Sequence, residues 1–356
     1  MVKPNSYLGQ KGYTIHKEEL TIEEQIKIRD ELTVKPYLPK CLGQTTPFPV
    51  YRESNQKFYL PRFYGEQKFG KLINSKLEKP EEIVIDFEGS LRDYQTKIVD
   101  IYTKNAKENA GGLLEIPCGR GKTVIALNII SQLKLKTLVI VHKGFLVDQW
   151  IERIQQFLPK ARIGRIQGQN IDIEDKDIVI GMLQSLSMKD YPQNLFSTFG
   201  LLIVDEVHHI AAEVFVRSLF KIVTKNILGL SATMQRKDGL TKVFKMFLGD
   251  IVYKETREGG DNVIVQAYTY TCDDEDFNED MVDWRGNPAY SSMISKLCNF
   301  NSRSEFILDI IENFYKKDTE QQIIILAHNK SLLTYLYKGV EYRNIASVGY
   351  YVGGMK

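Results

Sequence analysis

The sequence predicts an α/β protein built on a parallel β-sheet, with a small α+β domain before it and the start of a second sheet domain after it. Between residues 89 and 254, short apolar runs alternate with segments whose apolar residues recur at helical spacing, as in repeated βαβ units. The apolar runs are continuous, which indicates strands that are buried on both faces. The expected strands are 112–116, 137–141, 177–180, 201–204 and 227–230.

Composition is that of a globular chain of two or three domains. Of its 356 residues, 43% are hydrophobic and 26% charged. No apolar run is long enough to span a bilayer and no charged-then-apolar leader precedes the first domain, so we expect a soluble, intracellular protein without a membrane partner. Its four cysteines, Cys41, Cys118, Cys272 and Cys298, lack the paired spacing of a zinc site or a disulfide framework.

Changes in hydrophobic period divide the chain into four zones. They are an N-terminal accessory domain (1–88), the sheet domain (89–254), a linker with an acidic insertion (255–301) and the start of a second sheet domain (302–356). The last zone should open with a helix over 302–316 and a strand over 322–327. Charge is uneven, because residues 33–79 hold nine Lys or Arg against three Glu, whereas residues 273–283 hold seven acidic residues and no basic one. The first stretch suits a polyanionic partner and the second, a solvated loop, does not.

In the N-terminal zone, Thr21 and Glu24 form a capping-box pattern that predicts a helix with Ile22, Ile26 and Leu32 facing inward. Residues 51–69 alternate aromatic and polar side chains and are typical of short antiparallel strands. Basic residues lie among the aromatic ones: the aromatic set is Tyr51, Phe58, Tyr59, Phe63, Tyr64 and Phe69, and the basic set is Arg52, Lys57, Arg62, Lys68 and Lys71. Such a set could stack on bases and neutralise phosphates, or it could be the core and wet face of a small β layer.

A glycine-containing loop follows the first buried strand and precedes a helical run. Its sequence is Pro117-Cys118-Gly119-Arg120-Gly121-Lys122-Thr123. Gly119 and Gly121 would leave backbone amides free to converge on an anion at the helix N-terminus. Lys122 would contact the β and γ phosphates, and the Thr123 hydroxyl could ligate Mg²⁺. The strict phosphate-loop pattern has a glycine where this chain has Ile116, so the loop is a variant, and an ordinary strand-to-helix turn is the alternative.

Two adjacent carboxylates, Asp205 and Glu206, follow the apolar run 201–204. Side chains that end buried parallel strands meet at one edge of the sheet. There Asp205 could hold Mg²⁺ and Glu206 could position or deprotonate a water molecule. The alternative is a charged strand end in solvent.

Three ordered segments, Gly119-Arg120-Gly121-Lys122-Thr123, Asp205-Glu206-Val207-His208 and Ser231-Ala232-Thr233, resemble motifs I, II and III of the superfamily 2 helicases. The resemblance implies a RecA-like P-loop NTPase lobe, ATP and Mg²⁺ as ligands, and DNA, or alternatively RNA, as the partner. It also implies that Ser231, Ala232 and Thr233 couple hydrolysis to nucleic-acid binding and that His208 relays between the two.

Further segments resemble the remaining motifs of the family. In 91–95, Arg92 and Gln95 would contact adenine, and in 141–150 and 181–185 the residues His142, Lys143, Gln184 and Ser185 would contact the nucleic-acid backbone. Met182 stands where the family usually has Thr. Residues 229–240 are nearest to XPB-type translocases and the transcript-release helicases of large DNA viruses, although Lys237 departs from the XPB-type Arg-Glu-Asp triplet.

Residues 323–330 resemble motif IV, which opens a second RecA-like lobe, and 349–356 resemble the segment after it. The family's last motifs, which carry the arginines for the γ phosphate, have no counterpart before residue 356. Because an arginine finger contributes about 10³–10⁵ in rate in related NTPases, we expect weak or absent ATP hydrolysis from these residues alone. Two other functions stay open: a nucleotide-gated nucleic-acid-binding module, and the motor of a restriction-type nuclease, which the lack of a nuclease carboxylate cluster disfavours.

Overall fold

The computed structural model describes residues 3–37, 45–72, 74–192, 194–210, 212–235, 238–255 and 264–352. Contacts divide the chain into two compact units, Met1–Gly260 and Asp261–Lys356. The sequence-predicted boundary at residue 88 lies inside the first unit.

The first unit is organised around an eight-stranded sheet with the order β10-β9-β11-β8-β12-β13-β7-β14. Every pairing in it is parallel except that of β10 with β9. The strands are β7 (Gly111–Glu115), β8 (Thr137–Val141), β9 (Ile163–Gln167), β10 (Asn170–Asp172), β11 (Ile178–Met182), β12 (Leu201–Val204), β13 (Asn226–Ser231) and β14 (Ile251–Lys254). The predicted fold class is therefore confirmed, and the sequence missed only the three strands β9, β10 and β14.

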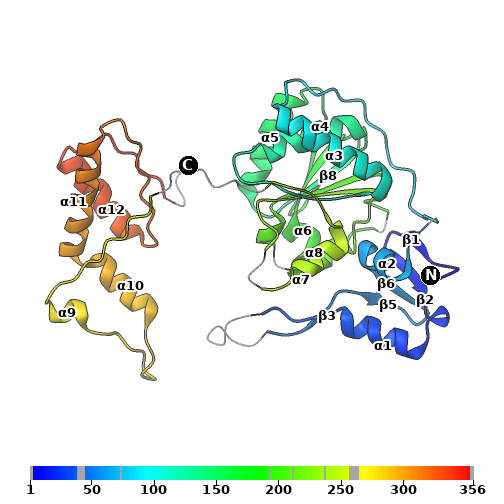
Figure 1. The fold of residues 1–356 in the computed structure, drawn as a ribbon, viewed down its shortest axis with the longest axis horizontal. Helices are drawn as coiled ribbons and strands as arrows, with labels where there is room; N and C mark the ends of the chain where they lie inside the picture. The colour runs from blue at the N-terminus through cyan, green and yellow to red at the C-terminus, as the bar shows by residue number, and fades with distance from the viewer. Residues whose placement is uncertain are drawn as a thin grey trace. The chain divides into compact units, whose positions relative to one another are not determined.

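Helices cover both faces of this sheet (Figure 1). One face carries α3 (Asp93–Asn109), α4 (Lys122–Leu133) and α5 (Gly144–Phe157), and the other carries α6 (Leu183–Met188), α7 (Ala212–Leu219) and α8 (Thr241–Leu248). Each face has its own apolar core. Because β7, β8, β11, β12 and β13 are parallel, their C-terminal ends share one edge, which is where ligands bind in such sheets. No helix among the described residues is both long and apolar enough to cross a bilayer.

The N-terminal residues form a four-stranded antiparallel sheet that packs against one of these two cores. The order is β1-β2-β6-β5, from β1 (Tyr7–Gly9), β2 (Gly12–His16), β5 (Arg52–Glu53) and β6 (Lys57–Leu60), and a separate pair joins β3 (Thr33–Val34) to β4 (Phe48–Pro49). Buried side chains of this region and of the large sheet belong to one continuous cluster. These residues are therefore not an independently packed domain.

The capping box at Thr21 and Glu24 is confirmed, and it starts α1 (Ile22–Glu31). The predicted inward face is wrong in part, since Ile22 and Ile26 are 77% and 51% exposed. The buried stripe is instead Ile28 and Leu32, which are four residues apart and so lie one above the other on the helix. The helix turns this second stripe, rather than the first, toward the sheet core.

The strands expected over 51–69 end at Leu60, and Arg62–Phe69 is the helix α2. Pro61 stands at its start, where a missing N–H costs nothing. Phe58, Tyr64 and Phe69 are buried, and Tyr51 and Phe63 pack partly against the same core. The core interpretation is confirmed for Phe58, Tyr64 and Phe69, which burial also removes from base stacking, whereas stacking stays a prediction for the partly exposed Tyr51, Tyr59 and Phe63.

The second unit contains the helices α9 (Glu275–Asn278), α10 (Tyr290–Asn299), α11 (Asn301–Lys317) and α12 (Lys330–Tyr342). The predicted helix over 302–316 is thus confirmed as α11. In the acidic stretch, which we expected to be a loop, Asp274 caps α9 by accepting a hydrogen bond from the Phe277 N–H.

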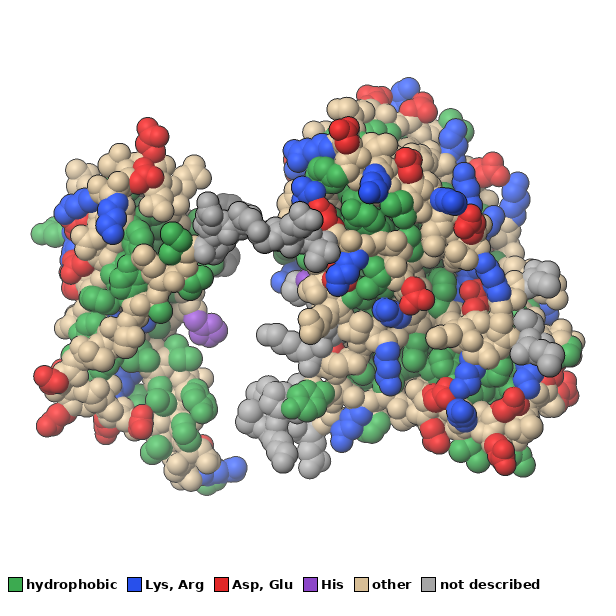
Figure 2. Space-filling view, viewed as in Figure 1, with side chains coloured by type: hydrophobic (Ala, Val, Ile, Leu, Met, Phe, Trp, Pro, Cys, Tyr) green, Lys and Arg blue, Asp and Glu red, His purple; other side chains and the backbone are tan. Residues whose placement is uncertain are grey.

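The strand predicted over 322–327 is wrong for the described residues, because the segment forms no ladder with any of them. Ile325 and Ala327 pack on the small core of α11 and α12, whereas Ile324 and Leu326 are exposed. Burial therefore alternates along this continuous apolar run, and only one of its two faces is covered. Figure 2 shows that hydrophobic side chains also reach the surface elsewhere in this unit.

Candidate active site

The phosphate-loop segment forms a tight turn between β7 and α4. Gly119 and Gly121 take φ angles of +80° and +76°, a left-handed conformation that glycine adopts without strain. A Cβ at Gly119 would meet no atom of the described residues within 4 Å, so that side of the loop is open. A Cβ at Gly121 would lie 2.5 Å from Nε2 of Gln95. The two glycines thus serve different purposes, one leaving room outside the loop and one packing against α3.

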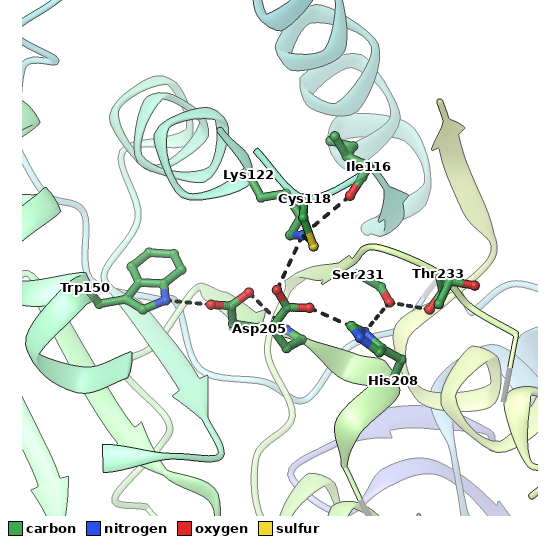
Figure 3. A network of polar contacts seen from close by, with 9 residues as sticks. Ile116, Cys118, Lys122, Trp150, Asp205, His208, Ser231 and Thr233 are labelled. Carbon is green, nitrogen blue, oxygen red and sulfur yellow. Dashed lines mark hydrogen bonds and ion pairs between the residues drawn. The ribbon is translucent and has the colours of Figure 1, made fainter. Parts of the chain in front are cut away.

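Lys122, the first residue of α4, is buried beneath this loop. Its Nζ lies 3.5 Å from the carbonyl oxygen of Ile116 and 4.0 Å from Sγ of Cys118. It also lies 3.4 Å from Oε1 of Glu206. The structure therefore brings the phosphate-loop lysine and the acidic pair together at one edge of the sheet, as the sequence predicted (Figure 3).

The two adjacent carboxylates have separate partners. Asp205 is buried, and its Oδ2 accepts a hydrogen bond from the Trp150 indole N–H at 2.8 Å, while its Oδ1 accepts one from the Glu206 backbone N–H at 2.9 Å. Glu206 has φ +49° and ψ +51°, which is a strained conformation for a residue with a Cβ. This sharp turn lets the Glu206 side chain face Lys122 while Asp205 faces Trp150.

Burial raises the pKa of Asp205 above its ordinary value, and the neighbouring Glu206 adds to the rise. The hydrogen bond from Trp150 and the charge of Lys122 act in the opposite direction. A divalent cation at this carboxylate would favour the ionised form, as cations do at metal sites.

His208 connects Glu206 to Ser231. Its Nδ1 lies 2.9 Å from Oγ of Ser231 and 3.3 Å from Oε2 of Glu206. The Ser231 hydroxyl donates to the carbonyl oxygen of Thr233 at 2.5 Å, so its oxygen accepts from His208 and Nδ1 carries the hydrogen. The ends of β12 and β13 are thereby linked through side chains (Figure 3).

The expected adenine segment supports the phosphate loop. Gln95 is buried; its Oε1 accepts from the Arg92 backbone N–H at 3.0 Å and its Nε2 donates to the Arg120 carbonyl oxygen at 3.2 Å. The exposed Arg92 side chain reaches the Tyr94 hydroxyl at 3.4 Å. Because both polar groups of Gln95 have partners within the protein, a contact between Gln95 and a base stays a prediction, and its observed role is to hold the loop.

Arg120 was predicted only as a loop residue, but it also makes tertiary contacts. Its guanidinium lies over the Tyr94 ring, 3.9 Å from the centroid, and forms an ion pair with Glu255, just after β14. Nothing in the local sequence signals this pair, since the two residues are 135 positions apart. Only the pairing of β14 beside β7 brings them together.

The residues expected to contact nucleic acid lie at the ends of β8 and β11, which are paired strands at the same edge of the sheet. Gln184 is exposed and its amide donates to the His142 carbonyl oxygen at 3.0 Å, while Lys143 is exposed beside the start of α5. Ser185 Oγ accepts from the Gly168 backbone N–H at 2.9 Å. The structure places all four at the same edge of the sheet as the acidic pair, which follows β12 beside β8. Residues 236–237, where Lys237 departs from the XPB-type triplet, lie outside the described part.

A surface that sequence reasoning missed lies on the outer face of the N-terminal sheet. Tyr7 and Tyr59 flank Thr14 in register across β1, β2 and β6. They line a hollow of about 280 Å³ with Gln10, Lys11 and Lys76, and none of the described residues that line it is acidic. Lys76 lies 3.9 Å from the Tyr7 ring centroid and Lys57 lies 3.3 Å from its hydroxyl. The excess of basic residues over 33–79 could be counted from the sequence, but the contacts of Lys57 and Lys76 with Tyr7 could not be predicted from it.

The donor set suits a magnesium-bound triphosphate. Asp205 and Thr123 offer hard oxygen ligands, which Mg²⁺ prefers, and Lys122 is a cation between the loop and the acidic pair. Among the described residues, Oε2 of Glu206 is buried and accepts no hydrogen bond, with Nδ1 of His208 3.3 Å away, and the outer side of Gly119 is open. The residues present therefore fit both the metal and the phosphates.

Comparison with known proteins decides the family. A family described as "Type III restriction enzyme, res subunit" matches residues 88–236. An Acanthamoeba polyphaga mimivirus protein, named as an ATP-dependent RNA helicase, is 33% identical over 97% of this chain and 68% of its own length. The chain belongs to the superfamily 2 helicases. It is of the XPB-like and viral type within them, and these are ATP-hydrolysing enzymes.

Two further similarities concern parts of this helicase chain. The DNA 3'-5' translocase XPB2 of Sulfurisphaera tokodaii is 30% identical over 68% of this chain and 53% of its own length. The solved structure of the UvsW helicase from bacteriophage T4 covers 65% of this chain and 94% of its own, with 16% identity and a TM-score of 0.46.

Proposed function

We propose that this helicase chain uses ATP hydrolysis to move along or remodel DNA, with RNA as the alternative polymer. The observation that carries the proposal is the convergence of Lys122, Glu206 and, through His208, Ser231 at one edge of the sheet. Among the relatives, one is named as a DNA translocase and another as an RNA helicase, so both polymers belong in the test.

In this mechanism the phosphate loop and Lys122 bind the β and γ phosphates. Thr123 and Asp205 would hold Mg²⁺, which neutralises charge on the phosphates when it is bound. Glu206 accepts the proton of the attacking water. These roles follow from position: Lys122 is the cation at the helix start, Asp205 is fixed from both oxygens, and Glu206 has a buried oxygen that accepts no hydrogen bond from any described residue.

The contact between Lys122 and Glu206 supports a switch between resting and active states. At 3.4 Å, the Lys122 ammonium forms an ion pair with Oε1 of the Glu206 carboxylate. When phosphate oxygens take over Lys122, Glu206 becomes free to accept a proton. His208 would then transmit the change to Ser231 and Thr233, because its Nδ1–H faces both Glu206 and Ser231.

Nucleic acid would bind beside this centre, at the ends of β8 and β11. His142, Lys143, Gln184 and Ser185 lie there, and contacts to the phosphate backbone suit a motor that moves irrespective of sequence. A second contact is proposed at the hollow between Tyr7 and Tyr59, where Lys11, Lys57 and Lys76 gather.

The test of hydrolysis is the Glu206→Gln variant, with Glu213→Gln on α7 as the matched control because Glu213 is exposed and pairs only with Arg217 among the described residues. In an enzyme that also carries the family's arginine motifs, turnover should fall about 10²–10⁴-fold in the Glu206 variant, with ATP affinity kept. Rates are measured with single-stranded DNA, duplex DNA and RNA in parallel. Unchanged turnover in that enzyme would remove Glu206 from the role of base, and nucleotide binding without turnover in the same enzyme without substitutions would favour a gated binding module instead.

A further inference from the structure

Trp150 reaches the acidic pair from a separate element. It lies in the middle of α5 and is 1% exposed, packed in the core between α5 and the large sheet. Its Nε1 donates to Oδ2 of Asp205 at 2.8 Å, a contact between residues 55 positions apart. A buried indole N–H needs an acceptor, and here that acceptor is a site carboxylate rather than a backbone carbonyl.

This hydrogen bond completes the fixation of the Asp205 carboxylate. Oδ1 is held by the Glu206 backbone N–H at 2.9 Å, and Oδ2 by Trp150. No ion pair to Asp205 is found among the described side chains, since the nearby Lys122 pairs with Glu206 instead. Two N–H donors on opposite oxygens therefore set the plane of the carboxylate.

We propose that Trp150 is a positioning residue that orients Asp205 toward the metal of a magnesium-bound nucleotide. The proposal rests on the proposed function, in which Asp205 is the metal-binding carboxylate. A carboxylate that binds a metal is oriented by the hydrogen bonds behind it, and removal of such a partner typically costs about 10- to 100-fold in metal affinity or activity. Trp150 is thus placed to act on Mg²⁺ through Asp205 without touching it.

The first test is Trp150→Phe, which keeps an aromatic ring in the core and removes the N–H. ADP binding is measured by calorimetry on the full chain, in EDTA and over a series of Mg²⁺ concentrations. We expect the Mg²⁺ concentration for half-maximal effect to rise about 10- to 100-fold, with affinity in EDTA unchanged. The matched control is Trp284→Phe, since Trp284 is 85% exposed and belongs to the second unit.

The second test keeps Trp150 and uses it as the probe. The chain has two tryptophans, so Trp284→Phe leaves Trp150 as the only source of indole emission. Emission should change when Mg²⁺ is added to the ADP-bound protein and return when EDTA removes it. This readout does not depend on the folding of the Trp150→Phe variant.

The outcomes separate the inference from the function on which it rests. A Mg²⁺ requirement of Trp150→Phe equal to that of Trp284→Phe, or Trp150 emission that ignores Mg²⁺, would overturn the positioning role and leave Trp150 a packing residue. If the ADP affinity of the unmodified chain does not depend on Mg²⁺, and Asp205→Asn does not alter that affinity, the proposed function itself is wrong, whatever the result for Trp150. A shifted Mg²⁺ requirement together with a responsive emission supports the inference.

Discussion

The two glycines of the phosphate loop allow a matched experiment, because they share a backbone conformation and differ in surroundings. Gly119 and Gly121 have φ angles of +80° and +76°. Replacing either by Ala costs about 1–2 kcal/mol of stability, the penalty of a left-handed conformation for a residue with a Cβ. The methyl group of Gly119→Ala would point into open space, whereas that of Gly121→Ala would meet Nε2 of Gln95 at 2.5 Å.

The size of the additional cost depends on whether Gln95 can move. Its amide is at the end of a flexible side chain, which by itself could move away from the new methyl group at little energetic cost. Gln95 is buried, however, and it is hydrogen-bonded to both Arg92 and Arg120. Displacing it leaves buried polar groups without partners, at about 1–3 kcal/mol. We therefore expect Gly121→Ala to lose about 2–5 kcal/mol in total and to melt at least about 2 °C below Gly119→Ala.

Gly119→Ala, although it loses less stability than Gly121→Ala, should weaken nucleotide binding. The methyl group of Gly119→Ala enters the open side of the loop, where phosphate oxygens would approach, so ADP affinity should fall by at least about tenfold, or 1.4 kcal/mol, despite the small loss of stability. Thermal unfolding and calorimetry on both variants measure the two effects. Equal melting temperatures would refute the packing role of Gly121, and unchanged ADP affinity in Gly119→Ala would refute the placement of the phosphates.

Two further predictions concern the N-terminal residues. Replacing the three lysines around the Tyr7 hollow, Lys11, Lys57 and Lys76, with Ala should reduce the slope of log DNA affinity against log salt concentration by about 2–3, because each phosphate contact contributes about 0.7–0.9 to that slope. The control is the same replacement at the exposed lysines of α3, Lys97, Lys104 and Lys107, which should leave the slope unchanged. Equal slopes in both triple variants would exclude the surface. Ile28→Ala should cost about 2–5 kcal/mol in chemical unfolding and Ile22→Ala less than about 0.5, because only Ile28 is buried; similar losses would contradict the assigned face of α1.

The lysine substitutions test DNA contact by the N-terminal residues more specifically than deletion of residues 1–88 would. Deleting that region would expose one side of a shared cluster, in which Phe58 and Leu60 belong to the same core as Leu113 and Leu138 of the large sheet. Loss of DNA binding after such a deletion would then report unfolding as readily as a lost contact.

The parts of the fold that the sequence predicted are those whose signal is local. The runs 137–141 and 201–204 are apolar without interruption because both faces of their strands are covered, and the structure places β8 and β12 at the same residues. By contrast, β14 (Ile251–Lys254) is partly exposed at the sheet edge and lacks such a run. The helix Arg62–Phe69 was missed because alternating aromatic residues also fit helical spacing once Pro61 ends the strand.

In the candidate site, too, the residues with a local sequence signal were predicted and the contacts that depend on tertiary packing were not. Lys122, Asp205 and Ser231 were found because each ends a buried strand or directly follows a buried strand or its loop, and parallel strands bring such residues to one edge. The supporting contacts were not found, since Trp150 to Asp205 and Arg120 to Glu255 join residues that no local pattern relates. Which of two stripes on α1 faces inward is likewise a property of the packed molecule.

The supporting contacts form a layer behind the residues that would meet the nucleotide, and each ties the site to a different element. Gln95 holds the loop to α3, Arg120 ties it to Glu255 after β14, and Trp150 fixes Asp205 from α5. Glu255 directly follows β14, which is an edge strand of the large sheet. A nucleotide that displaces Arg120 from the Tyr94 ring would therefore also disturb the ion pair between Arg120 and Glu255, and with it the tie between the phosphate loop and the end of β14.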